Sequence, residues 1–338
     1  MGLFHQKPSS VIAIEPEHDI RYFAYARHAL SEALRLCDCG PGDVVLLPEL
    51  ICRDVLSSIH SVGATSRFYP VDATLSAQNL ESNPPAKVVI AVNYFGFPQD
   101  LEPFNEYCSK TGAILIEDNA HGFLSKSPDG KFLGSRAPLG ITSIRKTFRL
   151  MNGAALHISD SKYVSNLHSQ LAYTNERPPL GMRSRITASR IQRSTRIPLL
   201  SLLQVSTRII RKLTTGSWLP ASSVESETSL PMPINPHQSL RNCVQQLRAE
   251  KEVLRRRNLF IATDRKLKSI GIDGIFTELL PGVSPYGYAF VANSQQLRSA
   301  KRRLRGLSVE VISWPDLPQA IRVDENHFYR NLRVVNFL

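Results

Sequence analysis

Residues 113–123 read AILIEDNAHGF. The apolar residues at the start of this stretch predict a buried β-strand, and Glu117 and Asp118 follow at its carboxyl end. A carboxylate at that edge of a sheet stands where a ligand can be held. The same position also suits a helix N-cap or a structural acid, which this stretch taken alone favours. The role of Asp118 therefore depends on what lies beside it.

The segments before this stretch alternate between short apolar runs and helical patterns. Strands are expected at 44–47, 66–71 and 87–92, and helices at 21–39, 52–62 and 101–111. Strands that are apolar throughout are typical of parallel sheets that helices cover on both faces. The sequence therefore predicts an α/β domain with a mainly parallel sheet, in which ligands bind at the carboxyl ends of the strands.

A lysine follows 28 residues after Asp118, in the sequence TSIRK of residues 142–146. An isolated lysine is usually a solvated surface group. Lys146, however, lies between the apolar GIT of residues 140–142 and LMNGAAL of residues 150–156, which predicts a place at the sheet edge beside Asp118. An aspartate and a lysine at neighbouring strand ends suit pyridoxal phosphate. The lysine can form a Schiff base with its aldehyde, and the aspartate can pair with its pyridine nitrogen.

The pattern changes after residue 235. Charged helices are expected at 239–268 and 295–304, with strands at 285–291 and 309–312. We therefore expect two domains. Residues 1–235 form a large cofactor-binding α/β domain, and residues 236–338 form a smaller C-terminal α+β domain.

The net charge of +12 is concentrated in one segment. Residues 177–224 contain nine Lys or Arg and no Asp or Glu, with apolar residues at spacings typical of helices. A basic helical connection packed on its own protein is the simpler interpretation. Binding to nucleic acid is the alternative, but aromatic residues for base stacking are lacking apart from Trp218, so nucleic acid is an unlikely partner.

Cysteine content and hydropathy restrict the class of protein further. Five cysteines in 338 residues do not form a disulfide framework, and they lack the spacing of a zinc site. No apolar run approaches the roughly 18 residues of a spanning helix. We expect a cytoplasmic protein with no metal site.

A series of segments, in order along the chain, resembles the DegT/DnrJ/StrS-type aminotransferases. These segments are ARHALSEAL (26–34), GPGDVVLLPELIC (40–52), VGATSRFYPVD (62–72), VNYFGFPQDL (92–101), GAILIEDNAHG (112–122), GKFLG (130–134), SIRKTFRLMNGAAL (143–156) and SVEVISWPDLP (308–318). The resemblance implies fold type I of the pyridoxal-phosphate transferases, with a large α/β domain, a small C-terminal domain and a homodimer. It also implies transfer of an amino group, with glutamate as the expected donor, to a nucleotide-linked keto-sugar in polysaccharide or secondary-metabolite synthesis.

The resemblance assigns three roles around the cofactor. Lys146 is similar to the lysine that forms the Schiff base and moves the proton during turnover. Asp118 is similar to the partner of the pyridine nitrogen. Ser143 is similar to the serine that contacts the cofactor phosphate.

Further candidate cofactor contacts follow from the same resemblance. His121 occupies the position of a residue that contacts the hydroxyl of the cofactor ring. The alternative is a structural histidine whose hydrogen bonds are made within the protein. Arg27 and His28 stand at the start of the helix whose amides hold phosphate in the family, and a surface arginine is the alternative for Arg27. Asn93 and Tyr94 correspond to a His-aromatic pair beside the active site.

The chain also departs from the family pattern. Ser143 lies three residues before Lys146 where many members have five, and Gly153-Ala154 replaces a Gly-Gly pair. Residues 50–52, LIC, offer no aromatic ring to stack on the cofactor, so an aliphatic side chain or Tyr94 is expected to cover its face. The chain stops at residues 334–338, VVNFL, where family members usually continue with a further helix. These differences leave a second hypothesis open: a relative with another pyridoxal-phosphate reaction, or a catalytically inactive scaffold.

Overall fold

The computed structural model describes residues 19–148, 150–177, 180, 181, 183, 184, 187, 188, 191, 225–307 and 309–337. Most of the basic segment 177–224, and with it the expected helical connection, lies outside these residues. No helix of the described residues has the length and apolar character that crossing a membrane requires.

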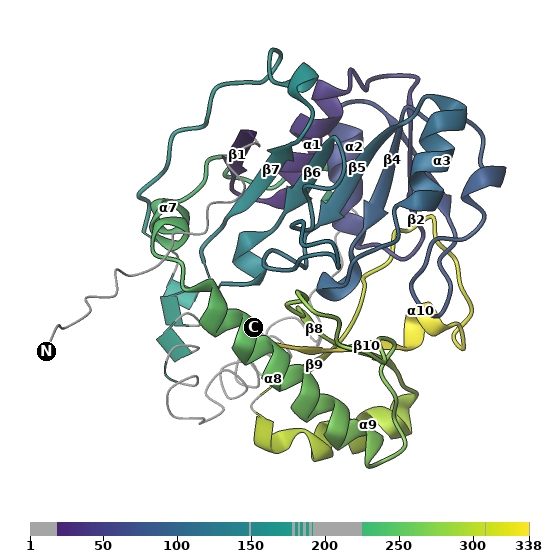
Figure 1. The fold of residues 1–338 in the computed structure, drawn as a ribbon, viewed down its shortest axis with the longest axis vertical. Helices are drawn as coiled ribbons and strands as arrows, with labels where there is room; N and C mark the ends of the chain where they lie inside the picture. Colours follow the sequence, from purple (N-terminus) through teal and green to yellow (C-terminus); the bar gives the residue numbers. More distant parts are fainter. Residues whose placement is uncertain are drawn as a thin grey trace, which may run out of the picture.

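A seven-stranded sheet forms the centre of the larger part of the molecule, in the strand order β1-β7-β6-β5-β4-β2-β3 (Figure 1). Its strands are β1 (Asp19–Phe23), β2 (Val44–Pro48), β3 (Thr65–Tyr69), β4 (Val88–Val92), β5 (Ile114–Asn119), β6 (Leu139–Thr142) and β7 (Ala154–Ile158). The pairings from β3 across to β6 are parallel, whereas β7 is antiparallel to both β6 and β1. The expected α/β fold with a mainly parallel sheet is confirmed.

Burial explains why these short segments form strands. Every residue of β4, β6 and β7 is buried, and helices α1 (Ala26–Leu36), α2 (Leu56–Ser61) and α3 (Glu102–Thr111) pack on the sheet. Side chains that are apolar on both faces of a strand require such cover. The resulting core holds the carboxyl ends of β4, β5 and β6 in a fixed arrangement.

One helix begins later than its periodicity predicts. The helix expected at 21–39 starts only at Ala26, because residues 19–23 form β1 and pair with β7 from Asp19↔Ile158 to Phe23↔Ala154. Backbone pairing along the edge of the sheet outweighs the weak local preference for helix at these residues. The start of α1 is thereby placed beside the ends of the central strands.

A second, three-stranded sheet lies below the first in Figure 1, in the order β8-β10-β9. Its strands are β8 (Gly287–Val291), β9 (Glu310–Ser313) and β10 (Leu332–Asn336), all antiparallel, with helices α8 (Ala249–Lys268) and α9 (Ser294–Arg303) beside them. Of the two remaining short helices, α6 (Glu225–Thr228) packs against α2 of the large sheet region, and α10 (Phe328–Asn331) directly precedes β10. The division at residue 235 stays a prediction.

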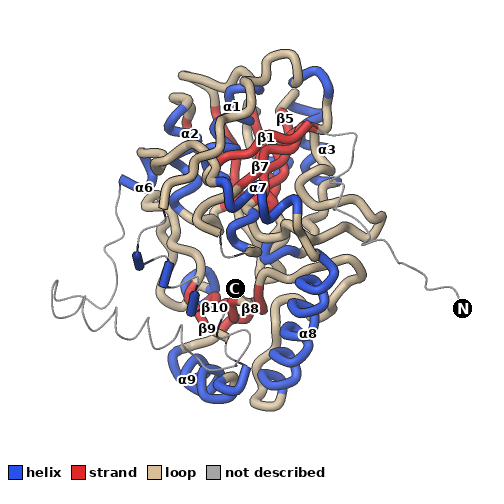
Figure 2. Tube along the Cα trace, turned by 90° about the vertical axis from the view of Figure 1, so that its left-hand side faces the viewer, coloured by secondary structure: helices blue, strands red, loops and turns tan. Residues whose placement is uncertain are grey.

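The long helix expected at 239–268 is two helices. Helix α7 (Gln238–Gln245) ends before α8 begins at Ala249. Leu240 of α7 is fully buried in a cluster with Ile144 and Ala155 of the large sheet region. The break lets α7 pack against the large sheet while α8 runs along the smaller one, as Figure 2 shows.

Candidate active site

A cavity of about 270 Å³ opens at the carboxyl ends of β5 and β6, beside the first turn of α1. Its wall includes side chains from the large sheet region and also Tyr286 and Trp314, which flank the smaller sheet. Five of the residues predicted for the site line this cavity: Arg27, Asp118, His121, Ser143 and Lys146.

Lys146 ends a single helical turn (Ile144–Lys146) that follows β6 almost directly. Its Nζ lies 3.2 Å from Nε2 of His121, and the side chain is partly buried. Desolvation lowers the pKa of Lys146, and Arg145 lowers it further. Both effects favour the neutral amine, which is the form that can accept a proton or attack an aldehyde.

Asp118 lies near the end of β5 and is 5% exposed. Its Oδ1 accepts a hydrogen bond of 2.8 Å from the Ala120 N–H. Burial raises the pKa of Asp118, whereas this hydrogen bond and the charge of Lys146 lower it. A carboxylate in this setting is stabilised when a cationic group enters the cavity beside it.

His121 is held between two rings. It stacks on Phe95 at 5.4 Å and on Tyr286 at 4.5 Å between ring centroids, and Trp314 meets its edge at 5.5 Å. Desolvation, with the nearby charge of Lys146, puts the pKa of His121 well below its usual value. The imidazole is therefore neutral, and its Nε2 can accept a hydrogen bond from Lys146.

Arg27 and Ser143 approach the cavity from two different elements. Arg27 lies in the first turn of α1 and forms an ion pair of 3.5 Å with Asp54. Ser143 follows β6 and is 2% exposed. A helix start, a hydroxyl and a guanidinium together are a set of donors typical of an anion site.

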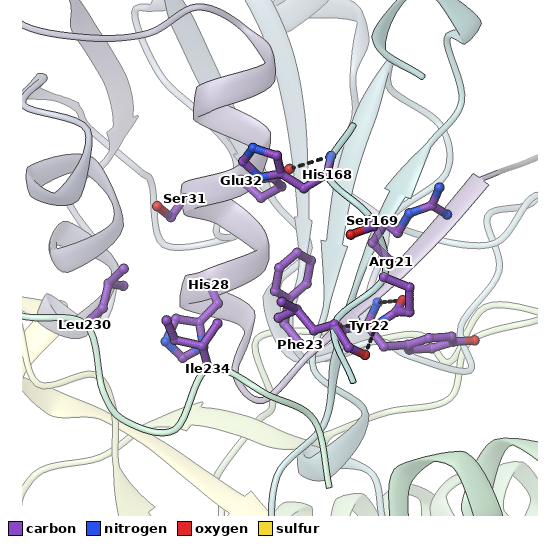
Figure 3. Close-up of a pocket in the computed structure, with 12 residues that line it drawn as sticks. Arg21, Tyr22, Phe23, His28, Ser31, Glu32, His168, Ser169, Leu230 and Ile234 are labelled. Carbon is purple, nitrogen blue, oxygen red and sulfur yellow. Dashed lines mark hydrogen bonds and ion pairs between the residues drawn. The ribbon is translucent and has the colours of Figure 1, made fainter. Parts of the chain in front are cut away.

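His28 does not reach this cavity. Neighbouring helix residues point about 100° apart, so His28 faces away from Arg27 and lines a separate cavity with Glu32 and Ile234 (Figure 3). Its Nε2 is 2.8 Å from the Pro231 carbonyl and donates to it. The predicted cofactor contact of His28 is therefore not supported by its placement.

Asn93 and Tyr94 also lie outside the cavity wall. The Asn93 side chain donates to Glu117 Oε1 at 2.7 Å and accepts from Arg136 at 3.0 Å. Tyr94 donates its hydroxyl to the Leu50 carbonyl at 2.9 Å. Glu117 points away from Asp118 because neighbouring strand residues face opposite sides of the sheet. Asn93 thus belongs to a buried polar network beneath the site.

Several cavity residues were not predicted. Cys52 lines the wall where the family pattern has a stacking aromatic. Tyr94, which was expected to offer a ring there, is not in the wall, and the rings in the cavity come from Tyr25, Tyr286 and Trp314. Arg145, directly before Lys146, was also missed. The helical pattern of residues 52–62 could not show that Tyr286 and Trp314, which are distant in the sequence, line the same cavity as Cys52. Arg145 could have been noticed as a second cation adjacent to the candidate lysine.

The fold is that of known aminotransferase structures. The chain superimposes on the aminotransferase TlmJ from Streptoalloteichus hindustanus with a TM-score of 0.62 and 20% identity, over 94% of this chain and 80% of that one. The sugar aminotransferase CalS13 from Micromonospora echinospora gives a TM-score of 0.61 at 16% identity, over 94% and 82% of the two chains. At these identities the likeness establishes the fold.

Sequence comparison then finds a similarity to one family over the first half of the chain. Residues 23–177 match the DegT/DnrJ/EryC1/StrS aminotransferase family, which confirms the resemblance seen in the motifs. A dTDP-4-dehydro-2,3,6-trideoxy-D-glucose 4-aminotransferase from Saccharopolyspora spinosa is 29% identical over 114 residues, 32% of this chain and 29% of the relative. A UDP-N-acetyl-3-dehydro-alpha-D-glucosamine 3-aminotransferase from Acidithiobacillus ferrooxidans is 31% identical over 120 residues, 34% and 32% of the two. The chain thus spans about a third of the length of these curated relatives.

Proposed function

We propose that the protein is a pyridoxal-phosphate-dependent aminotransferase. It moves an amino group from an amino acid, expected to be glutamate, to a keto-sugar carried on a nucleotide. One observation supports this most directly: Lys146, with a lowered pKa, shares a single cavity with the buried carboxylate of Asp118 and the neutral ring of His121. The matched relatives are sugar aminotransferases by name.

The residues of the cavity fit the cofactor by their chemistry. Asp118 offers a buried carboxylate for a protonated ring nitrogen, and Lys146 offers an amine for an aldehyde. Arg145 has a buried Nε without a hydrogen-bond partner, which suits an anionic group. When bound, the cofactor supplies an aldehyde that carries the amino group and a ring that withdraws electrons.

The protein contributes proton handling, orientation and exclusion of water. The neutral amine of Lys146 can take a proton from a carbon held above it and return it to a neighbouring atom. His121 orients that amine through the contact of 3.2 Å. Tyr286 and Trp314 cover the cavity and limit access of water.

The same proposal includes a cytoplasmic homodimer with nucleotide-sugar and amino-acid substrates. Family resemblance supports the dimer, and the free state of all five cysteines is consistent with a reducing compartment. Light scattering should give twice the chain mass of 37.8 kDa. A mass of one chain at micromolar concentration would contradict the dimer.

The test of the activity is the absorbance of the protein with added pyridoxal phosphate. We expect a band in the ~400–430 nm region for the wild type, absent in Lys146→Ala and retained in Lys110→Ala, whose lysine is exposed. Glutamate should then shift the wild-type spectrum and release 2-oxoglutarate when a nucleotide-linked keto-sugar is added. A band without amino transfer would favour the second hypothesis of another reaction on the same cofactor. No band in the wild type would overturn the cofactor assignment.

A further inference from the structure

Glu117 is a buried carboxylate that the proposed chemistry does not use. It has no exposed surface, and it lies on the opposite face of β5 from Asp118. Three donors of Arg136 reach its carboxylate: the backbone N–H at 2.9 Å, Nε at 2.8 Å and Nη2 at 2.7 Å. Asn93 adds a fourth donor, Nδ2, at 2.7 Å. A buried charge with this many hydrogen bonds fixes the groups around it.

Glu117, Arg136 and Asn93 form one polar network, and it reaches the ends of three neighbouring strands. Arg136 donates from Nη2 to Oδ1 of Asn93 at 3.0 Å, and from Nη1 to the Gln99 carbonyl at 3.2 Å. Oδ1 of Asn93 also accepts a hydrogen bond of 2.9 Å from the Gln99 N–H. Glu117 belongs to β5, Asn93 directly follows β4, and Arg136 shortly precedes β6. The polar network therefore ties the three strands together beneath the cavity of Lys146.

Asp118 is attached to the polar network through the backbone. It follows Glu117 directly, so a shift of the Glu117 backbone also moves Asp118. The backbone N–H of Asn93 donates to the Asp118 carbonyl at 2.9 Å, beside the last paired residues of β4 and β5, Val92 and Asp118. Strand β5 ends one residue later, at Asn119. The direction of the Asp118 carboxylate therefore depends on how firmly this end of β5 is held.

Charge also links the two neighbouring carboxylates. Burial raises the pKa of Asp118, and the charge of Glu117 raises it further. The Ala120 N–H and the charge of Lys146 lower the same pKa. Arg136 lies 2.7 Å from Glu117 and offsets its negative charge. Because two adjacent carboxylates disfavour each other's ionisation, the cation of Arg136 favours the ionised form of both.

We propose that Glu117, held by Arg136 and Asn93, is a positioning residue that fixes the Asp118 carboxylate for contact with a protonated ring nitrogen. Glu117 touches neither cofactor nor substrate and acts through its neighbour. The ring nitrogen belongs to the proposed function, on which this role of Glu117 rests. The hold of the polar network on Asp118 is independent of any cofactor. A buried ion pair that only stabilises the fold is the alternative.

The first experiment compares the affinity for pyridoxal phosphate with that for its carbocyclic analogue, in which a C–H group replaces the ring nitrogen. Asp118→Asn should weaken pyridoxal phosphate by about 10–100-fold, the range of hydrogen bonds to charged groups, and should not weaken the analogue. Glu117→Gln should weaken pyridoxal phosphate by about 10-fold, the lower end of that range, because the Asp118 carboxylate remains but is held less firmly. The analogue should again bind as in the wild type.

Glu32→Gln is the matched control. Glu32 is 9% exposed and accepts two hydrogen bonds from Arg35, at 2.8 and 3.0 Å, but it lines the separate cavity on the other side of α1. Its substitution also breaks a buried ion pair, so the thermal midpoint should fall. The ratio of the two affinities should stay that of the wild type. Equal weakening of both ligands by Glu117→Gln, or weakening of neither in a folded variant, would overturn the proposal.

A double variant separates the placement of Asp118 from the stability of the fold. Glu117→Met with Arg136→Met replaces the buried ion pair by apolar side chains, a change that is often neutral or stabilising. A positioning role predicts a reduced preference for pyridoxal phosphate over the analogue even where the thermal midpoint matches the wild type. Recovery of the full preference together with the stability would show that the ion pair acts only on the fold.

The last experiment needs no cofactor. The carboxyl carbon of Asp118 is titrated by NMR in cofactor-free protein labelled with ¹³C-aspartate, and Asp118→Asn assigns its signal. Glu117→Gln removes a like charge and leaves the Arg136 cation, so the pKa of Asp118 should fall. Arg136→Met leaves the Glu117 charge without its cation, so the pKa of Asp118 should rise.

These opposite shifts distinguish the failure of the proposed function from the failure of the positioning role. A wild type without a cofactor band refutes the proposed function, whereas opposite shifts of the Asp118 titration still support the hold of the polar network on that carboxylate. A shift in the same direction in both variants, or no shift in either folded variant, would overturn the role of Glu117. Circular dichroism checks that each variant is folded.

Discussion

Lys146 is placed at a position that disfavours its charged form. Below its lowered pKa the lysine is charged in both the folded and the unfolded protein, so the full desolvation penalty is present. Between that pKa and 10.5 the unfolded chain binds more protons, and the stability of the fold rises with pH. The residue chosen for chemistry is therefore one that weakens the cofactor-free fold near neutral pH.

Lys146→Met should accordingly stabilise the cofactor-free protein at pH 7. The gain should shrink as the pH rises toward 10.5, because the wild-type lysine then loses the charge whose burial is unfavourable. Urea unfolding of both proteins over this pH range measures the difference. Lys110→Met, at an exposed lysine, should show no such trend. A variant less stable than wild type throughout would refute this account.

Gly140 of β6 shows how tightly the strands beneath the site are packed. A methyl group at this position would run into the carbonyl of Gly134. Gly140→Ala should lower the free energy of unfolding by about 1–3 kcal/mol, as overpacked cores do. Gly306→Ala is the matched control, since open space surrounds that position. Equal denaturation midpoints for the two variants would show that residues 134–140 shift to accommodate the methyl group without loss of stability.

At the scale of elements, one buried side chain joins helix α8 to both sheets. Arg256 is 1% exposed and pairs with Glu252 at 2.8 Å. It also donates to the carbonyls of Thr147 at 2.9 Å and Pro285 at 3.1 Å. Those carbonyls belong to the residues next to Lys146 and Tyr286. Helix α8 therefore holds the backbone at Lys146 and the backbone at Tyr286 in a fixed arrangement.

Arg256→Met should therefore destabilise the protein by about 3–5 kcal/mol, because it leaves Glu252 and several carbonyls with fewer buried partners. The thermal midpoint should fall, and any cofactor band of the remaining folded protein should weaken. Arg265→Met on the exposed face of the same helix serves as the control. If both variants have the same thermal unfolding midpoint as the wild type, the contact between α8 and the turn that carries Lys146 does not contribute to stability.

At the scale of the whole molecule, the cavity is completed only where the two sheets meet. Trp314 follows β9 and packs edge-on against Phe95 at 4.8 Å between centroids. The next residues are tied to the large sheet region, since Arg53 pairs with Asp316 at 3.1 Å and donates to the Leu317 carbonyl at 2.8 Å. The C-terminal half thus supplies part of the wall around Lys146.

Trp314→Ala should open this wall. The loss of the buried ring should lower stability by about 3–5 kcal/mol, and the affinity for pyridoxal phosphate should fall as water gains access. Trp314→Phe should retain most of both properties, because a ring still meets Phe95 and His121. Denaturant unfolding and a cofactor titration measure the two effects separately. A Trp314→Ala variant with unchanged cofactor affinity would show that the ring is not part of the functional cover.

The parts of the site that were predictable lie close to apolar strands in the sequence. Asp118 and Lys146 each come at or just after a run of apolar residues, and parallel strands bring their carboxyl ends to one edge. The sequence did not show that His28 faces a separate cavity, because a motif does not give the rotation of a helix about its axis. It did not show the buried hydrogen bonds of Asn93, because the partners Glu117 and Arg136 come from other segments.

The sequence by itself determined the α/β class, the strands of the large sheet other than β1, and the lysine, aspartate and serine near their ends. Local apolar patterns carry that information, because a segment that is apolar on both faces is by itself a sign of a buried strand. Only the tertiary structure decided that β1 joins the sheet edge, that α7 and α8 are separate, and that Tyr286 and Trp314 line the cavity of Lys146. Those features depend on contacts between residues that lie far apart in the sequence, and no local pattern encodes which distant surfaces meet.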